Sequence, residues 1–232
     1  MARRLFFVSE IHRGKAELHG DDAKHLTRVL RVEPGQVYQI SDNQNLYLAE
    51  VETAHKGLVS FAVKEKLDFQ PPAVEITLYA ALIKFDHWEW MLEKATELNV
   101  TRIVPVHAER TDKGLEQAAV KRSERWKKIV LEASQQCRRV LLPAIEEVVS
   151  FEEATKSKAD LRIFCDEEGG IHPRELSGQK IETAAVLIGP EGGWTDQERQ
   201  QATEWKVVSL GPNVLRAETA AIAALTTIFH IA

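Results

Sequence analysis

The stretch Leu187-Ile-Gly-Pro-Glu-Gly-Gly-Trp194 decides how the second half of this chain folds, and Leu210-Gly-Pro-Asn-Val-Leu-Arg-Ala-Glu-Thr219 repeats its pattern. Each follows a short apolar run, residues 184–188 and 207–210, and leads into a segment with helical spacing. The pattern predicts a strand, a glycine loop and a helix, twice. Glycine permits positive φ and close approach of a ligand, and a helix start offers free N–H groups. Together the loops predict a binding site for a polar small molecule.

Neither loop carries a phosphate-binding fingerprint, because the first is neither a Walker A nor a GxGxxG sequence and lacks the Lys-Ser/Thr pair. The loops instead combine backbone donors and carbonyls with the apolar side chains of Leu187, Leu210, Val214 and Leu215. This combination favours an adenosine-like ligand without a triphosphate. Two alternatives stay open: each glycine makes only a tight turn, or Arg216 only pairs with Glu218 or Glu191.

Composition indicates a globular protein with a core, since 44% of the 232 residues are hydrophobic and 28% are charged. No apolar run approaches the roughly 20 residues that span a bilayer. Cys137 and Cys165 are the only cysteines, so we expect no disulfide framework and a cytoplasmic location. No Cys/His cluster has zinc spacing, so we expect no metal.

Charge is spread unevenly along the chain. The net charge of −5 argues against a general nucleic-acid binder, because phosphate affinity comes from Lys and Arg. Residues 110–139 nevertheless hold nine Lys/Arg against four Asp/Glu, an excess of 9 − 4 = +5. This stretch is either an RNA-facing surface or an ordinary solvated one.

The prolines at 71 and 72 predict a boundary between two domains, residues 1–71 and 72–232. Before the boundary, short β-like runs with turn residues between them predict a small β-barrel, at residues 5–8, 37–40, 46–51 and 58–63. A helix-like segment at residues 21–31 interrupts these runs. After it, strands predicted at residues 75–83, 102–106, 161–165, 184–188 and 207–210 alternate with helices.

The helices of this second domain are expected after capping boxes at Asp86 and Thr195, and over residues 116–138 and 217–229. Asn99 tolerates the left-handed conformation and is well placed to end the first of them. Alternation of strand and helix predicts an α/β fold with a mostly parallel sheet covered on both faces.

The ordered motifs of this chain resemble those of the RsmE family, which are S-adenosylmethionine-dependent SPOUT methyltransferases that act on N3 of a uridine in small-subunit (16S) rRNA. The resemblance spans nearly the whole chain. Besides the two glycine loops, it includes His25-Leu-Thr-Arg-Val-Leu-Arg31, Lys84-Phe-Asp, Leu92-Glu-Lys-Ala-Thr-Glu-Leu-Asn99, Arg110-Thr111 and Glu132-Ala-Ser-Gln-Gln-Cys-Arg-Arg139. Asn99 and Arg138 depart from it, since family members often have glycine there.

The resemblance implies a PUA-like β-barrel followed by a SPOUT methyltransferase domain with a C-terminal trefoil knot, and a homodimer. It implies S-adenosyl-L-methionine as cofactor, with small-subunit rRNA or the assembled 30S subunit as partner and no membrane or metal. The cofactor-binding residues that it implies are Leu187, Ile188, Gly189, Pro190, Gly192, Gly193, Leu210, Gly211, Val214, Leu215, Arg216 and Thr219.

Methylating uridine N3 requires loss of its proton, which spreads negative charge over O2 and O4. A guanidinium stays protonated and offers planar donors, so Arg216 is expected to stabilise that charge. Glu191 or Glu218 is expected to take the proton, although an unperturbed carboxylate is a weak base. N3 lies on the Watson–Crick edge, so the base must be unpaired or flipped out.

Basic residues near these motifs are the candidates for RNA contact: Arg28, Arg31, Lys84, Arg110, Arg138 and Arg139. The five tryptophans are expected to be core or interface residues, apart from Trp194, which borders the first loop and is a candidate for stacking on a base. Two other functions remain alternatives. One is a SPOUT methyltransferase acting on another RNA such as tRNA, and the other is a non-catalytic RNA-binding ribosome-assembly protein.

Overall fold

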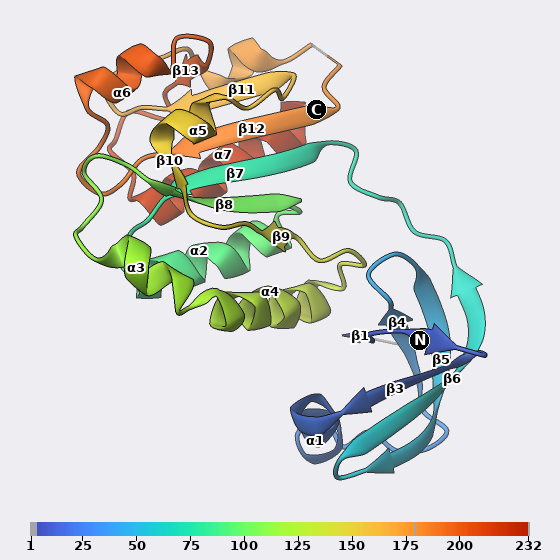
Figure 1. Ribbon diagram of the computed structural model, residues 1–232. Coiled ribbons are helices and arrows are strands. Elements are labelled where there is room, and N and C mark those ends of the chain that lie inside the picture. The colour runs from blue at the N-terminus through green and yellow to red at the C-terminus, as the bar shows by residue number, and fades with distance from the viewer. Residues whose placement is uncertain (1–3, 179, 232) are drawn as a thin grey trace. The chain divides into compact units, whose positions relative to one another are not determined.

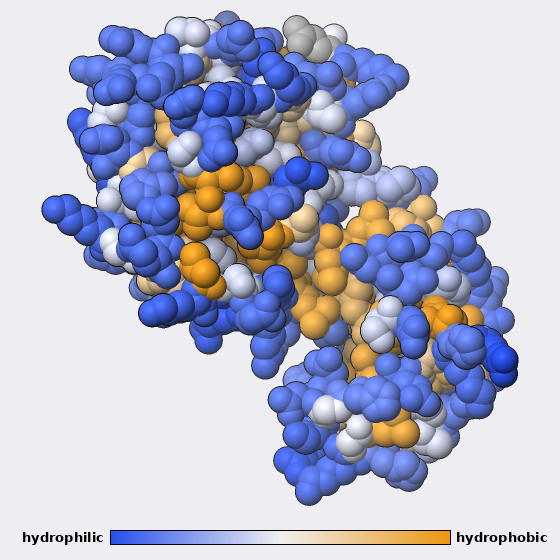
Figure 2. Space-filling view, in the orientation of Figure 1, coloured by the Kyte–Doolittle hydropathy of each residue, from blue (hydrophilic) through white to orange (hydrophobic). Residues whose placement is uncertain are grey.

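The computed structural model describes residues 4–178 and 180–231 (Figure 1). The described residues form two compact units, one containing residues 4–71 with Ser134–Leu142 and the other residues 72–133 and 143–231. Each unit has its own hydrophobic core. Within the described ranges, no helix has the length and apolar character needed to cross a bilayer. The surface over α6 is largely hydrophilic in the view of Figure 2.

The N-terminal unit is a six-stranded sheet in the order β1-β4-β5-β6-β3-β2. Its pairs are antiparallel except β1 with β4. The elements are β1 (Leu5–Phe7), β2 (Ile11–His12), β3 (Lys15–His19), α1 (Gly20–Arg28), β4 (Val37–Ser41), β5 (Leu46–His55) and β6 (Leu58–Leu67). Leu26 of α1 packs into the same core as Phe6, Ile40 and Phe61. The hairpin of β2 and β3 was not predicted from the sequence, because only Ala16 and Leu18 of β3 face the core.

The C-terminal unit is built on a parallel sheet in the order β10-β8-β7-β12-β11-β13, with β9 paired to β8. Its strands are β7 (Glu75–Ala81), β8 (Arg102–His107), β9 (Ala144–Ile145), β10 (Val149–Ser150), β11 (Leu161–Cys165), β12 (Thr183–Ile188) and β13 (Lys206–Val208). Its helices are α2 (Phe85–Glu97), α3 (Leu115–Val120), α4 (Ser123–Cys137), α5 (Phe151–Thr155), the 3₁₀ turn η1 (Pro173–Leu176), α6 (Asp196–Gln201) and α7 (Ala217–Ile231). The last residues of α4, 134–137, are grouped with the N-terminal unit.

Alternate residues of β12 enter two separate cores. Val186 packs with α2 and α7, whereas Leu187 packs with Phe151 of α5 and with Trp194. Because successive side chains of a strand point to opposite faces, the sheet is covered on both faces. The predicted α/β fold with a mostly parallel sheet is confirmed.

Two predicted helix boundaries are wrong. The cap of α2 is Lys84, without a side-chain hydrogen bond, and Asp86 lies inside the first turn, where its charge complements the helix dipole. The single helix expected over residues 116–138 is two helices, α3 and α4. The guanidinium of Arg122, at the break, lies 4.5 Å from the ring centroid of Phe85 and donates to Glu89 Oε1 at 2.8 Å. These tertiary contacts are invisible to local spacing.

Two other predictions from local sequence patterns are confirmed in the structure. The Thr195 capping box is present at the start of α6, and Asn99 has a φ of +66° after α2. Arg138 has a φ of +60° after α4. Both positions where the resemblance departs from glycine therefore adopt the left-handed conformation that glycine favours.

Glu89 joins α2 to the start of α4. Hydrogen bonds from Arg125 and, less strongly, from Arg122 outweigh burial and hold the pKa of the Glu89 carboxyl below its usual value. Because the folded pKa lies below the unfolded one, the ionised carboxylate stabilises the fold above the unfolded pKa of about 4.3, and this stabilisation is lost as pH falls through the folded pKa.

We therefore expect Glu89→Gln to lower the free energy of unfolding at pH 7 by on the order of 1 kcal/mol. The difference from wild type shrinks below about pH 4. Urea unfolding at both pH values measures it, with Glu124→Gln as control, since that side chain is 84% exposed. A difference that persists unchanged in acid contradicts the assigned ion pair.

Candidate functional site

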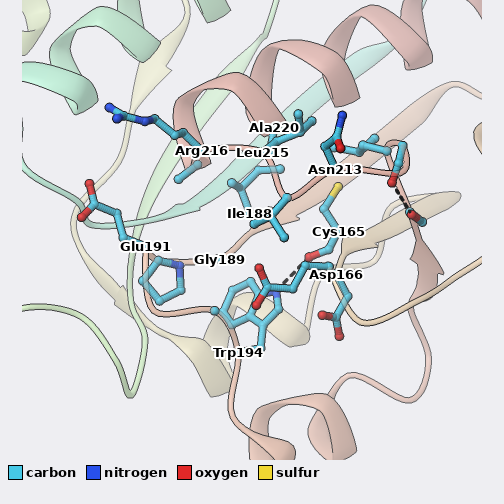
Figure 3. A pocket seen from close by; sticks show the side chains of 18 of the residues that line it. Cys165, Asp166, Ile188, Gly189, Glu191, Trp194, Asn213, Leu215, Arg216 and Ala220 are labelled. Carbon is cyan, nitrogen blue, oxygen red and sulfur yellow. Dashed lines mark hydrogen bonds between the residues drawn. The ribbon is translucent and has the colours of Figure 1, made fainter.

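A cavity of about 490 Å³ opens at the carboxyl ends of β7, β11, β12 and β13, and both glycine loops line it (Figure 3). Ligands of open parallel sheets bind at this edge. The loops meet here because β11 pairs with both β12 and β13. Figure 3 shows Trp194 on one side of the cavity, Leu215 and Ala220 on the other, and Ile188 between them.

The first loop is anchored to the core through Trp194. Its ring stacks on Phe164 at a centroid distance of 5.0 Å, and its Nε1 donates to Cys165 O at 2.9 Å. Gly189 lies directly against this ring, since a Cβ there would come within 3.0 Å of Trp194 Cε2. The ring is 2% exposed and belongs to the core, so the expectation that it stacks on an RNA base is not supported.

The second loop is the more exposed of the two. Ser209 N donates to Ile171 O at 3.2 Å, which ties the start of the loop to the sheet. Beyond Gly211 the chain is open to solvent, and the apolar side chain of Val214 is 74% exposed. An exposed apolar residue on a cavity rim is available to cover a bound ligand.

Most of the predicted cofactor-binding residues line this one cavity, namely Ile188, Gly189, Pro190, Gly193, Leu210, Gly211, Val214, Leu215 and Arg216. Three do not. Leu187 is a residue of β12 that is buried in the core, Gly192 packs against the side chain of Arg110, and Thr219 is exposed on α7.

The charged residues expected to act in chemistry fall into two groups. Arg216 and Glu191 line the cavity and are exposed. Glu218 is outside the lining and 7% exposed, and its Oε1 lies 2.8 Å from Nδ1 of His87. His87 itself lines the cavity and was missed from the sequence. The sequence signal was its position directly after Asp86, inside the segment that was interpreted only as a capping box.

Asp166, at the end of β11, brings a carboxylate to the cavity. Its burial raises the pKa, but hydrogen bonds from Arg199 and from backbone N–H groups outweigh burial and lower it overall. Arg199 Nε lies 2.7 Å from Asp166 Oδ2. The cavity therefore contains an ionised carboxylate that is held rigidly by a cation behind it.

The predicted RNA-binding residues lie in both units. Lys84 lines the cavity, and Arg110 Nη1 donates to the carbonyls of Gly192 and Trp194 at 2.8 and 3.2 Å, so it braces the first loop. Burial lowers the pKa of the Arg139 guanidinium to about 10. Arg139 belongs to the N-terminal unit together with Arg28, Arg31 and Arg138.

The fold and the cavity define an α/β protein with two glycine loops at the carboxyl edge of a parallel sheet. Two family models match it, one described as RNA methyltransferase domain over residues 70–229 and one as RNA methyltransferase PUA domain over residues 18–64. The ribosomal RNA small subunit methyltransferase E of Aquifex aeolicus is 30% identical over 97% of this chain and 98% of its own length.

Two solved structures are similar over nearly their whole length. The ribosomal RNA small subunit methyltransferase E of Neisseria gonorrhoeae, bound to S-adenosyl methionine, has a TM-score of 0.88 at 28% identity, covering 98% of this chain and 97% of that one. A methyltransferase from Legionella pneumophila in complex with the cofactor SAM has a TM-score of 0.87 at 26% identity, covering 97% and 96%. The chain therefore belongs to the ribosomal RNA small subunit methyltransferase E family of RNA methyltransferases.

Proposed function

We propose that the protein transfers a methyl group from S-adenosyl-L-methionine to N3 of a uridine in small-subunit (16S) rRNA. One observation carries the proposal: in a chain of this family, two glycine loops meet at the carboxyl edge of the sheet and line one cavity. The proposal extends to the fold, as a SPOUT domain with a trefoil knot over residues 72–232 and a PUA-like barrel over residues 1–71.

The residues of the cavity fit this cofactor. A volume of about 490 Å³ lies in the range of small-molecule sites. Gly189 and Gly193 approach their neighbours so closely that a Cβ would come within 3.0 Å of Trp194 and 2.8 Å of Glu167, so neither position of the first loop has room for a side chain. We propose that the predicted loop residues hold the cofactor, Leu187, Gly192 and Thr219 acting from behind the cavity wall. When bound, the cofactor supplies an electrophilic methyl group on a sulfonium.

The chain's own residues then act on the uridine. Arg216 lies at the start of α7 on the cavity wall, where its guanidinium stabilises the charge that develops on O2 and O4 of the deprotonated base. Glu191 lines the same cavity and has direct access to the site. Glu218 lies outside the cavity lining and has access through His87, which its Oε1 contacts.

Gly193 gives a direct test of cofactor binding. Its φ is +69°, and a Cβ would come within 2.8 Å of Glu167 Oε1, so Gly193→Val distorts the first loop. We expect at least about 10-fold weaker binding of S-adenosyl-L-methionine by calorimetry, which corresponds to about 1.4 kcal/mol. Gly35→Val is the matched control, because Gly35 has a φ of +84° with nothing within 4 Å. Equal affinity in both variants would place the cofactor elsewhere.

We also propose which residues contact RNA, the oligomeric state and the cellular location. Arg28, Arg31, Lys84, Arg110, Arg138 and Arg139 are proposed to contact RNA phosphates, which position a substrate without reading its sequence. We propose a homodimer that acts in the cytoplasm on rRNA or on the assembled 30S subunit.

The substrate is tested with methyl-labelled cofactor offered to unmodified 30S subunits, naked 16S rRNA and tRNA in parallel. We expect label in small-subunit RNA and none in tRNA. Label confined to tRNA would support a SPOUT enzyme of another specificity. RNA binding without transfer to any of the three would support a ribosome-assembly protein.

A further inference from the structure

We infer that His87 accepts the N3 proton of the uridine and that Glu218 positions His87 for this step. The inference rests on the proposed function. From the sequence alone, the proton acceptor was expected to be Glu191 or Glu218, and the inference assigns this role to His87 instead. It also gives a role to a carboxylate that is buried and yet outside the cavity lining.

The geometry is that of an imidazole held from behind by a carboxylate. His87, in the first turn of α2, lines the cavity together with Arg216, and its side chain is 28% exposed. Its Nδ1 lies 2.8 Å from Glu218 Oε1 on α7, whose side chain is 9% exposed. An ionised carboxylate only accepts hydrogen bonds, so Nδ1 carries the hydrogen and Nε2 is left with the lone pair.

The burial of Glu218 is unusual for a purely structural residue. Among the described residues, its Oε2 is a buried side-chain atom without a hydrogen-bond partner. A buried carboxylate with one unsatisfied oxygen destabilises the fold. Such a feature is typically retained at a functional site, where a fixed negative charge favours a neighbouring cation during a reaction.

The charged groups around His87 support the protonation of Nε2. Asp86 Oδ2 lies 3.7 Å from Nε2, beyond hydrogen-bond distance, and its side chain is 80% exposed. Glu218 faces the ring from α7, and Glu191 lines the same cavity. The cations Lys84 and Arg216 also line it and balance this negative charge around the reacting base.

The proton transfer balances as follows. The N3–H bond of uridine breaks and its proton passes to Nε2 of His87, giving an imidazolium beside Glu218. The electron pair left on N3 forms the new bond to the methyl carbon, and the pair of the broken carbon–sulfur bond stays on sulfur. The imidazolium then releases its proton to solvent. An imidazole suits this task, because histidine is the side chain that proteins use most often to move a proton in general acid–base catalysis.

Three matched variants test the inference in the full-length protein with 30S subunits. His87→Gln keeps an N–H that can donate to Glu218 but cannot take a proton. We expect it to retain cofactor affinity and the melting temperature while the rate of methyl transfer falls about 10²-fold or more. Glu218→Gln is expected to lower the rate about 10-fold. His107→Gln is the control, since Nδ1 of His107 lies 2.7 Å from Glu116 Oε2 outside the cavity, and its rate stays at the wild-type value.

The pH–rate profile separates chemistry from structure. The wild-type rate is expected to rise with pH and then level off once the imidazole is neutral. The His87→Gln rate is expected to keep rising with pH, because hydroxide must then generate the N3 anion. Loss of rate by the same factor at every pH, or an unchanged rate, overturns the assignment of His87.

An NMR measurement on the protein without cofactor or RNA gives a second readout. The ¹⁵N shifts of His87 are expected to report hydrogen on Nδ1 in the wild type and a mixture of tautomers in Glu218→Gln. Hydrogen on Nε2 in the wild type overturns the positioning role. Failure of the inference is distinct from failure of the proposed function, because the wild type would then still produce 3-methyluridine.

Discussion

Arg216→Ala is expected to abolish most methyl transfer while leaving the fold and much of the cofactor affinity intact. Arg216 lines the cavity, is exposed and directly precedes α7, the helix that carries Glu218. Removing one donor that stabilises developing negative charge lowers the turnover rate by about 10²- to 10³-fold. Single-turnover transfer to 30S subunits measures the loss, and calorimetry measures cofactor binding separately.

The control for Arg216 is Arg174→Ala, which removes an exposed guanidinium from the same unit away from the cavity lining. Its transfer rate should match the wild type. Arg216→Lys keeps the charge but loses the planar set of donors, so it should recover only part of the rate. If Arg216→Ala turns over normally, Arg216 has no part in the mechanism.

Trp194→Ala is expected to destabilise the protein by about 3–5 kcal/mol, the range for truncating a large buried aromatic residue. The ring stacks on Phe164, contacts Phe151 at a centroid distance of 5.0 Å and supports Gly189 from below. Its loss therefore opens a cavity under the first loop and weakens cofactor binding as well. Urea unfolding measures the stability, and calorimetry measures the affinity.

Two further variants separate the contributions of Trp194. Trp194→Phe keeps an aromatic ring but removes the hydrogen bond to Cys165 O and part of the buried indole, so it should destabilise the protein, though by less than Trp194→Ala. Trp90→Ala removes a ring that is 46% exposed and should have a much smaller effect. Equal losses at positions 90 and 194 would contradict the placement of Trp194 in the core.

Local sequence signals predicted the elements that carry the cavity. The strands before each glycine loop, the Thr195 cap and the left-handed Asn99 all depend on chemistry within a few residues, and each is present. The parallel sheet then followed from the alternation of strands and helices. The meeting of the two loops in one cavity is a consequence of that topology.

The features that could not be predicted from the sequence depend on tertiary contacts between residues that are distant in the chain. His87 is 131 positions from Glu218, and no spacing rule links a residue at the start of one helix to one on another helix. At the break between α3 and α4, Arg122 likewise contacts two residues that are distant in the sequence, Phe85 and Glu89. Trp194 was ambiguous because a ring beside a loop can face either a ligand or the core, and only packing distinguishes the two.

The most direct test is the identity of the methylated nucleoside. Unmodified 30S subunits are incubated with the protein and methyl-labelled S-adenosyl-L-methionine, and the RNA is digested to nucleosides for mass spectrometry. The proposed function predicts label in 3-methyluridine from a single position of the 16S rRNA, and about 10²-fold less, or lower still, with Arg216→Ala. Label in another nucleoside, or at a ribose 2′-oxygen, would contradict uridine N3 as the site of methylation.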